Sequence, residues 1–148
     1  MATTVTAADL TVTITETYSL NGVDYGNTMN KTYTSNGEIY QRVMSVLSAD
    51  VTSLIDFGAA DGRGTVDKSN YTYFRITNLD DTNFITLTIT TGDTFFYKLK
   101  AGETFLLMDN EMDAIASSTT FGAFADITNI SAQANTDGVD VELMCVTV

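Results

Sequence analysis

Histidine, tryptophan and proline are all absent from this chain of 148 residues, and cysteine occurs once. Without histidine the chain lacks the usual general base, the imidazole metal ligand and the side chain that titrates near neutral pH. A single cysteine allows no intrachain disulfide and no thiolate cluster for zinc. We therefore expect no enzymatic activity, no cofactor and no bound metal.

Positive charge is also scarce, because seven Lys and Arg residues stand against nineteen Asp and Glu residues and leave a formal net charge of −12. Nucleic acid and anionic membranes would add like charge to like charge, so we expect the chain to bind neither. No apolar run approaches the roughly 18 residues that span a bilayer. Residues 1–6 show neither the basic region nor the apolar core of a secretion signal.

Threonine is abundant, and its branched side chain favours β-strands. From Leu10 to Leu20, apolar residues occupy most even positions, whereas Thr or Ser occupies every odd position. This alternation is typical of a half-buried strand. The pair Asn21-Gly22 follows it and predicts a tight hairpin turn. A second strand is expected over residues 28–34, before another turn at Asn36-Gly37.

Residues 43–55 fit either one helical face or two strands. The content of Val, Thr and Ser favours two strands joined near Ala49-Asp50. A helical turn is expected over residues 109–117, with Asp109 as its N-cap. In the strand expected over residues 94–100, alternation directs Phe95, Tyr97 and Leu99 inward. The other strands are expected over residues 38–47, 71–78, 84–91, 103–108, 126–132 and 139–148.

Nine or ten short strands with regular turns are typical of an antiparallel sandwich or barrel. We expect an all-β, jelly-roll-like antiparallel sandwich that forms a single domain over residues 1–148. Residues 1–37 are a candidate for an N-terminal hairpin or arm that is used in assembly.

Two acidic stretches are candidate calcium sites, one over residues 61–67 and one formed by Asp137, Asp140 and Glu142. Neither matches the twelve-residue calcium loop, so both are interpreted as solvated turns. Pairs of carboxylates are inevitable among nineteen acids and do not indicate a glycosidase, particularly without a Trp to stack on a sugar. Cys145 alternates with apolar residues and is expected in the core.

The candidate binding residues are Tyr71, Tyr73 and Arg75, which alternation places on one face of their strand, opposite Phe74 and Ile76. One interpretation is that the tyrosines cover a sheet edge with their hydroxyl groups in water. The other is a protein-contact face, because Tyr and Arg are enriched at interface hot spots. No catalytic, cofactor-binding or metal-binding residue is predicted.

Two segments carry a family resemblance: Tyr73–Ile85, which contains the sequence RITNLD, and Leu99–Leu107, which contains Gly-Glu-Thr-Phe. Together with a closing strand that begins Val139–Leu143, they resemble small β-sandwich virion proteins of tailed bacteriophages, marine phages of the cyanophage type especially. The resemblance spans about residues 38–148 and leaves residues 1–37 outside it.

Within the resembling segments, Arg75 is expected to pair with the Asp80-Asp81 turn, and Asn78 and Asn83 to cap that connection through the local backbone. Gly102 is expected to adopt a positive φ. All of these roles are structural.

The resemblance implies a non-enzymatic structural protein of the virion, most simply a capsid decoration or cement protein that stabilises the shell. Its partner would be the major capsid protein or another virion protein, and the chain would be a homo-oligomer, with a trimer favoured. A tail, collar or fibre-base protein is the alternative within the same particle. A carbohydrate-binding module or adhesin domain is the alternative of another class.

Overall fold

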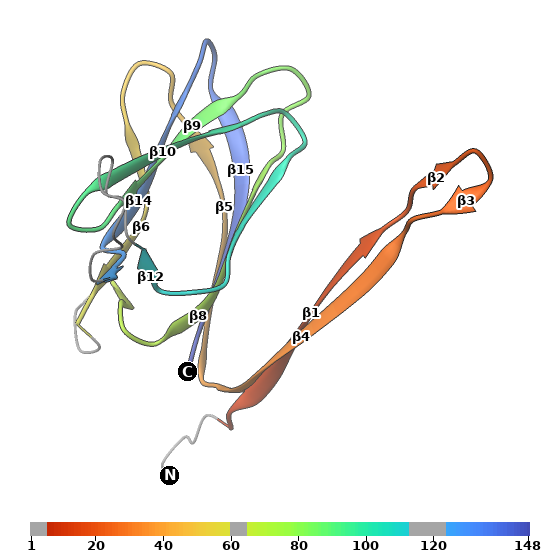
Figure 1. Cartoon of the computed structure of the whole chain (residues 1–148). Coiled ribbons are helices and arrows are strands. Elements are labelled where there is room, and N and C mark those ends of the chain that lie inside the picture. The colour runs from red at the N-terminus through yellow and green to blue at the C-terminus, as the bar shows by residue number, and fades with distance from the viewer. Residues whose placement is uncertain (1–5, 60–64, 113–123) are drawn as a thin grey trace. The chain divides into compact units, whose positions relative to one another are not determined.

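The computed structural model describes residues 6–59, 65–112 and 124–148, and every regular element in these residues is a β-strand (Figure 1). The chain divides into two compact units, Met1–Gly37 with Val148, and Glu38–Thr147. The sandwich therefore occupies the second unit and does not extend over the whole chain.

The first unit is a long β-hairpin. Strand β1 (Ala8–Glu16) pairs antiparallel with β4 (Asn27–Asn36), and the short strands β2 (Ser19–Leu20) and β3 (Val23–Asp24) pair near the tip (Figure 1). Asn21 and Gly22 have φ angles of 51° and 79°. Positive φ at both central residues is what a tight hairpin turn of this kind requires, so the predicted Asn-Gly turn is confirmed.

The second predicted turn, at Asn36-Gly37, is not a hairpin turn. The positive φ in this region belongs to Ser35, at 63°, and β4 does not pair with the strand that follows it. Instead, Asn36 closes the base of the hairpin, because its side-chain amide donates to the carbonyl oxygens of Ala8 at 3.0 Å and Tyr33 at 2.7 Å.

The second unit contains two larger sheets. The five-stranded sheet has the order β10 (Thr94–Leu99), β9 (Ile85–Thr90), β14 (Asn129–Ala134), β6 (Thr52–Gly58) and β7 (Val66–Asp67). The four-stranded sheet has the order β11 (Thr104–Leu107), β8 (Tyr71–Asn78), β15 (Val139–Thr147) and β5 (Glu38–Val46). A two-stranded sheet of β12 (Glu111–Met112) and β13 (Ala125–Asp126) accompanies them. All pairings are antiparallel except that of β6 with β7.

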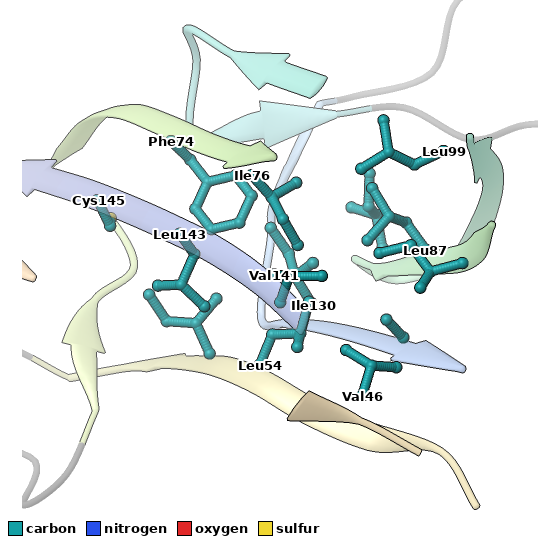
Figure 2. Close-up of a cluster of buried hydrophobic side chains, with 14 of the residues drawn as sticks. Val46, Leu54, Phe74, Ile76, Leu87, Leu99, Ile130, Val141, Leu143 and Cys145 are labelled. Atoms are coloured by element: carbon teal, nitrogen blue, oxygen red, sulfur yellow. The ribbon is translucent and has the colours of Figure 1, made fainter. Parts of the chain in front are cut away.

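The two sheets contribute to one apolar core, which Figure 2 shows in part. Alternation predicted its members well in β9, where Ile85, Leu87 and Ile89 are all fully buried. Val141, Leu143 and Cys145 fill the same core from β15. The all-β antiparallel sandwich is thus confirmed, and its jelly-roll connectivity stays a prediction.

The ambiguous residues 43–55 form two strands, as predicted, since β5 ends at Val46 and β6 begins at Thr52. The predicted helical turn over residues 109–117 is wrong where the structure describes it. The Asp109 carboxylate accepts the backbone N–H of Glu111 at 3.1 Å, and Glu111–Met112 pair with β13 as a strand. The remaining residues, 113–117, lie outside the described residues.

Strand β10 departs from the predicted alternation of burial. Leu99 is fully buried, whereas Phe95 is 39% exposed and Tyr97 is 37% exposed. Both β10 and the four-residue β11 lie at sheet edges, and the rings of Tyr97 and Phe105 meet there with centroids 4.8 Å apart. The predicted inward face is confirmed, because Phe95 and Tyr97 pair with the fully buried Ile89 and Leu87 of β9 and so point to the core side of the sheet. They are not fully buried, because an edge strand has no neighbour on one side to cover its side chains.

Candidate interaction surfaces

The predicted contact face of Tyr71, Tyr73 and Arg75 does not form an exposed patch. Tyr71 is 2% exposed and Tyr73 is 5% exposed. Between them, Thr72 is an extra residue in the pairing of β8 with β15, where the register shifts. A bulge of this kind interrupts the alternation of faces. Tyr71 therefore joins the core and stacks on Phe57, with ring centroids 4.4 Å apart.

Arg75 is engaged on the surface of the four-stranded sheet. Its guanidinium lies 3.0 Å from the carboxylate of Glu142 and donates to Thr77 Oγ1 at 2.9 Å. Gln41 also donates to Glu142, at 3.0 Å. These hydrogen bonds and the Arg75 charge hold the pKa of Glu142 below its usual value. The prediction that Arg75 pairs with the Asp80-Asp81 turn is therefore wrong.

Asp80 instead organises its own turn. Its carboxylate accepts the backbone N–H groups of Asn83 at 2.6 Å and Thr82 at 2.7 Å, and these bonds lower the pKa of Asp80. Gly102 has φ of 71°, as predicted.

Asn78 does cap this connection, and it is fully buried. Its side-chain oxygen accepts the N–H of Asp80 at 2.9 Å, and its amide donates to the carbonyl oxygens of Asn83 at 2.9 Å and Leu99 at 3.3 Å. The amide group therefore links the end of β8 to the following turn and to the end of β10.

Two buried groups titrate abnormally. Burial raises the pKa of the Cys145 thiol to about 12, and Cys145 is in the core as predicted. Burial also raises the pKa of the Tyr71 hydroxyl, which has no hydrogen-bond partner within the described part of the chain. A buried thiol held neutral in this way is a poor nucleophile.

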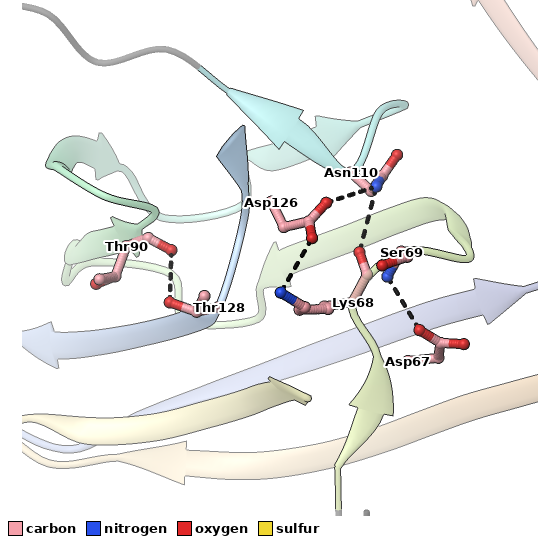
Figure 3. Close-up of polar contacts among 7 residues, drawn as sticks. All are labelled: Asp67, Lys68, Ser69, Thr90, Asn110, Asp126 and Thr128. Carbon is pink, nitrogen blue, oxygen red and sulfur yellow. Dashed lines mark hydrogen bonds and ion pairs between the residues drawn. The ribbon is translucent and has the colours of Figure 1, made fainter. Parts of the chain in front are cut away.

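A polar cluster joins residues 67–70 to the β12–β13 sheet (Figure 3). The Lys68 ammonium lies 3.2 Å from the carboxylate of Asp126, and the Asn110 amide donates to Asp126 at 3.2 Å and to the carbonyl of Lys68 at 3.3 Å. Asp67 accepts the backbone N–H of Ser69 at 3.0 Å. The carboxylates of this cluster are therefore engaged by local donors.

Of the first calcium candidate, residues 61–64 lie outside the described residues. Across residues 6–59, 65–112 and 124–148, no group of three or more His, Cys, Asp or Glu side chains is arranged to hold a metal ion. The same residues contain no helix long and apolar enough to cross a membrane.

The N-terminal hairpin has two chemically different faces. One face carries a ladder of cross-strand polar pairs, Thr11 with Thr32, Thr13 with Asn30 and Thr15 with Thr28, at 2.8–3.3 Å. The predicted alternation of β1 is thus confirmed. The other face carries Leu10, Val12 and Ile14, which are only partly covered. Towards the tip, the exposed apolar side chains are Tyr18, Leu20, Val23, Tyr25 and Met29.

A second exposed apolar surface lies on β10. Phe96 is 65% exposed, next to the half-covered rings of Phe95 and Tyr97. The Lys98 ammonium lies 3.9 Å from the centroid of the Phe84 ring. The sequence indicated the hairpin, since residues 1–37 were a candidate assembly arm. It gave no sign of the β10 edge, because exposure there depends on which strands have neighbours.

Comparisons with protein-family models, with curated proteins and with solved structures each found no match.

Proposed function

We propose that the chain is a non-enzymatic structural protein of a phage virion, of the capsid decoration or cement kind, which binds the major capsid protein or another virion protein. The sequence resemblance over residues 38–148 supports a location in the virion. The N-terminal hairpin supports the binding role, and it is the observation that carries the proposal.

The hairpin has the properties of a segment that is covered by a partner. A two-stranded hairpin is at best marginally stable in water, yet this one exposes apolar side chains along its length and at its tip. Covering them would contribute roughly 25 cal/mol per Å² of apolar surface before the cost of association. The outer edges of β1 and β4 also present backbone groups that a neighbouring strand can pair with.

The location of the chain in the particle is tested by quantitative mass spectrometry of purified particles from the source, which counts the copies of the chain per particle. Hundreds of copies, in fixed ratio to the major capsid protein and retained when tails are sheared off, would support decoration. A few dozen copies or fewer would favour the tail, collar or fibre base. Absence from clean particles would contradict the virion proposal and favour the carbohydrate-binding or adhesin alternative, which a glycan array then tests.

The role of the hairpin is tested by binding the purified chain to particles that lack it. Leu20→Ser with Tyr25→Ser removes apolar side chains at the hairpin tip and is expected to weaken binding at least tenfold. Ile39→Ser is the matched control, because Ile39 is 67% exposed but belongs to the sandwich unit. Equal weakening by both variants would contradict a specific role for the hairpin.

A further inference from the structure

We propose that β10 pairs with the β10 of a second copy, antiparallel, about a two-fold axis that passes beside Phe96. This contact would join the five-stranded sheets of two copies into one continuous sheet. It does not depend on the virion proposal, because it can be measured on the purified chain.

Strand β10 is an open edge. Within the described residues it pairs with β9 alone, so its other side presents backbone N–H and C=O groups that have no strand beside them. Five of its six residues are exposed, and none is proline. A lysine on an edge usually discourages pairing. Here the Lys98 ammonium lies over the Phe84 ring of its own sandwich, which leaves the edge accessible.

The pleat of the sheet restricts the register of such a pair. In an antiparallel pair, residues directly opposite each other point to the same face of the sheet, whereas successive residues of one strand point to opposite faces. A two-fold axis normal to the sheet must therefore pass beside one residue, because an axis between two residues would set opposite faces against each other. An axis beside Phe96 sets the two Phe96 rings opposite each other and sets Phe95 opposite Tyr97. Thr94 then lies opposite Lys98. An axis beside Tyr97 would pair Phe95 with Leu99 and lose these aromatic pairs, which favour the first register.

Charge favours a second copy as the occupant. The chain carries a net charge of −12, so copies repel over most of their surface. The β10 edge is different, because Lys98 and Lys100 lie at its end and Asp93 precedes its start. Antiparallel pairing brings the acidic start of each strand beside the basic end of the other. A basic partner would instead be attracted to the acidic remainder of the surface.

The register is tested by cross-linking the full chain through an introduced cysteine. Phe96→Cys is expected to form a disulfide-linked dimer under mild oxidation, because the two copies of residue 96 face each other within disulfide range. Thr88→Cys is the matched control. Thr88 is the β9 partner of Phe96 and shares its face, but in the dimer its two copies would lie about 14 Å apart. Cys145 is buried and does not compete.

The association itself is tested by sedimentation equilibrium. The unmodified chain is expected to dimerise more tightly at about 0.5 M salt than at low salt, because salt screens the repulsion between acidic copies. Phe96→Glu sets two carboxylates opposite each other and is expected to weaken dimerisation at least tenfold more than Phe96→Thr. Unchanged thermal unfolding of both variants would show that the fold is intact.

Three results would overturn the proposal. The first is a chain that stays monomeric at every concentration and salt. The second is equal cross-linking of Phe96→Cys and Thr88→Cys. The third is an oligomer, such as the trimer that the resemblance implies, that survives Phe96→Glu unchanged and yields no Phe96→Cys dimer.

Discussion

The side-chain amide of Asn78 lies 3.3 Å from the carbonyl oxygen of Leu99, and this contact links the end of β8 to the end of β10. The two strands belong to different sheets. The backbone of Asn78 also forms two hydrogen bonds, because its N–H donates to the carbonyl oxygen of Glu103 at 3.0 Å and its carbonyl oxygen accepts the N–H of Gly102 at 3.1 Å. One buried residue therefore holds the two sheets together where β10 and β11 form their edges.

Asn78→Ala is expected to lower the free energy of unfolding by about 3 kcal/mol, since it removes three hydrogen bonds to backbone groups, of which the Leu99 carbonyl is buried and those of Asp80 and Asn83 are part-buried. Urea unfolding measures the change. Asn129→Ala is the matched control, because the Asn129 amide bonds mainly to the exposed side chains of Ser53 and Asp56. We expect that control to cost about 1 kcal/mol or less. A cost for Asn78→Ala no larger than the control would contradict the linking role.

Arg75→Met is expected to raise the pKa of Glu142 towards its usual value, because the substitution removes a hydrogen bond and a positive charge. A lowered pKa in the folded state contributes stability above the unfolded pKa, and this contribution disappears as the pH falls through the folded value. The variant should therefore lose less stability than the parent on acidification below about pH 4.5. NMR titration of the Glu142 carboxyl measures the shift.

The overall effect of Arg75→Met near neutral pH is expected to be small. Both partners of the ion pair are about a quarter exposed, and the free energy of unfolding should change by less than about 1 kcal/mol. Lys68→Met, which removes the ion pair of Lys68 with Asp126, provides a comparison in which Glu142 should titrate as in the parent. A Glu142 pKa that is the same in Arg75→Met and in the parent would show that Arg75 does not set it.

Tyr71→Phe is expected to stabilise the fold by about 1 kcal/mol near neutral pH, since it removes a buried hydroxyl that has no partner among the described residues. The pKa of Tyr71 is raised in the folded state. Above about pH 10 the unfolded chain therefore ionises Tyr71 while the folded chain does not, so the folded parent loses stability as the pH rises further. The variant should therefore resist alkaline unfolding better than the parent.

Thermal unfolding of Tyr71→Phe at pH 7 and above pH 10 measures both effects. Tyr97→Phe is the control, because Tyr97 is more than one-third exposed and its substitution should change stability by less than about 0.5 kcal/mol. Destabilisation of Tyr71→Phe at pH 7 would show that the hydroxyl has a partner that stabilises it.

Deletion of residues 1–37 is expected to leave a chain that unfolds in one cooperative transition, because the described members of the sandwich core all belong to the unit Glu38–Thr147. Circular dichroism during urea unfolding measures this. A peptide of residues 6–37 should lack stable structure, as isolated two-stranded hairpins generally do. A deleted chain without a cooperative transition would show that the sandwich needs the hairpin to fold.

Features that depend on neighbouring residues in the chain could be predicted from the sequence. The alternation of Ile85, Leu87 and Ile89 determines which side chains can point to one face, and the structure buries all three. The Asn21-Gly22 turn and the positive φ of Gly102 follow from the conformations that these residues adopt most easily. Such features need no knowledge of distant partners.

The tertiary structure alone decided which surfaces are exposed. A bulge at Thr72, set by the pairing of β8 with a strand far along the chain, buried Tyr71 and removed the predicted contact face. The position of β10 at a sheet edge left Phe95 and Tyr97 more than one-third exposed, although alternation had placed them correctly on the core face. Alternation determines which side chains share a face, whereas the pairing of distant strands determines whether that face is covered.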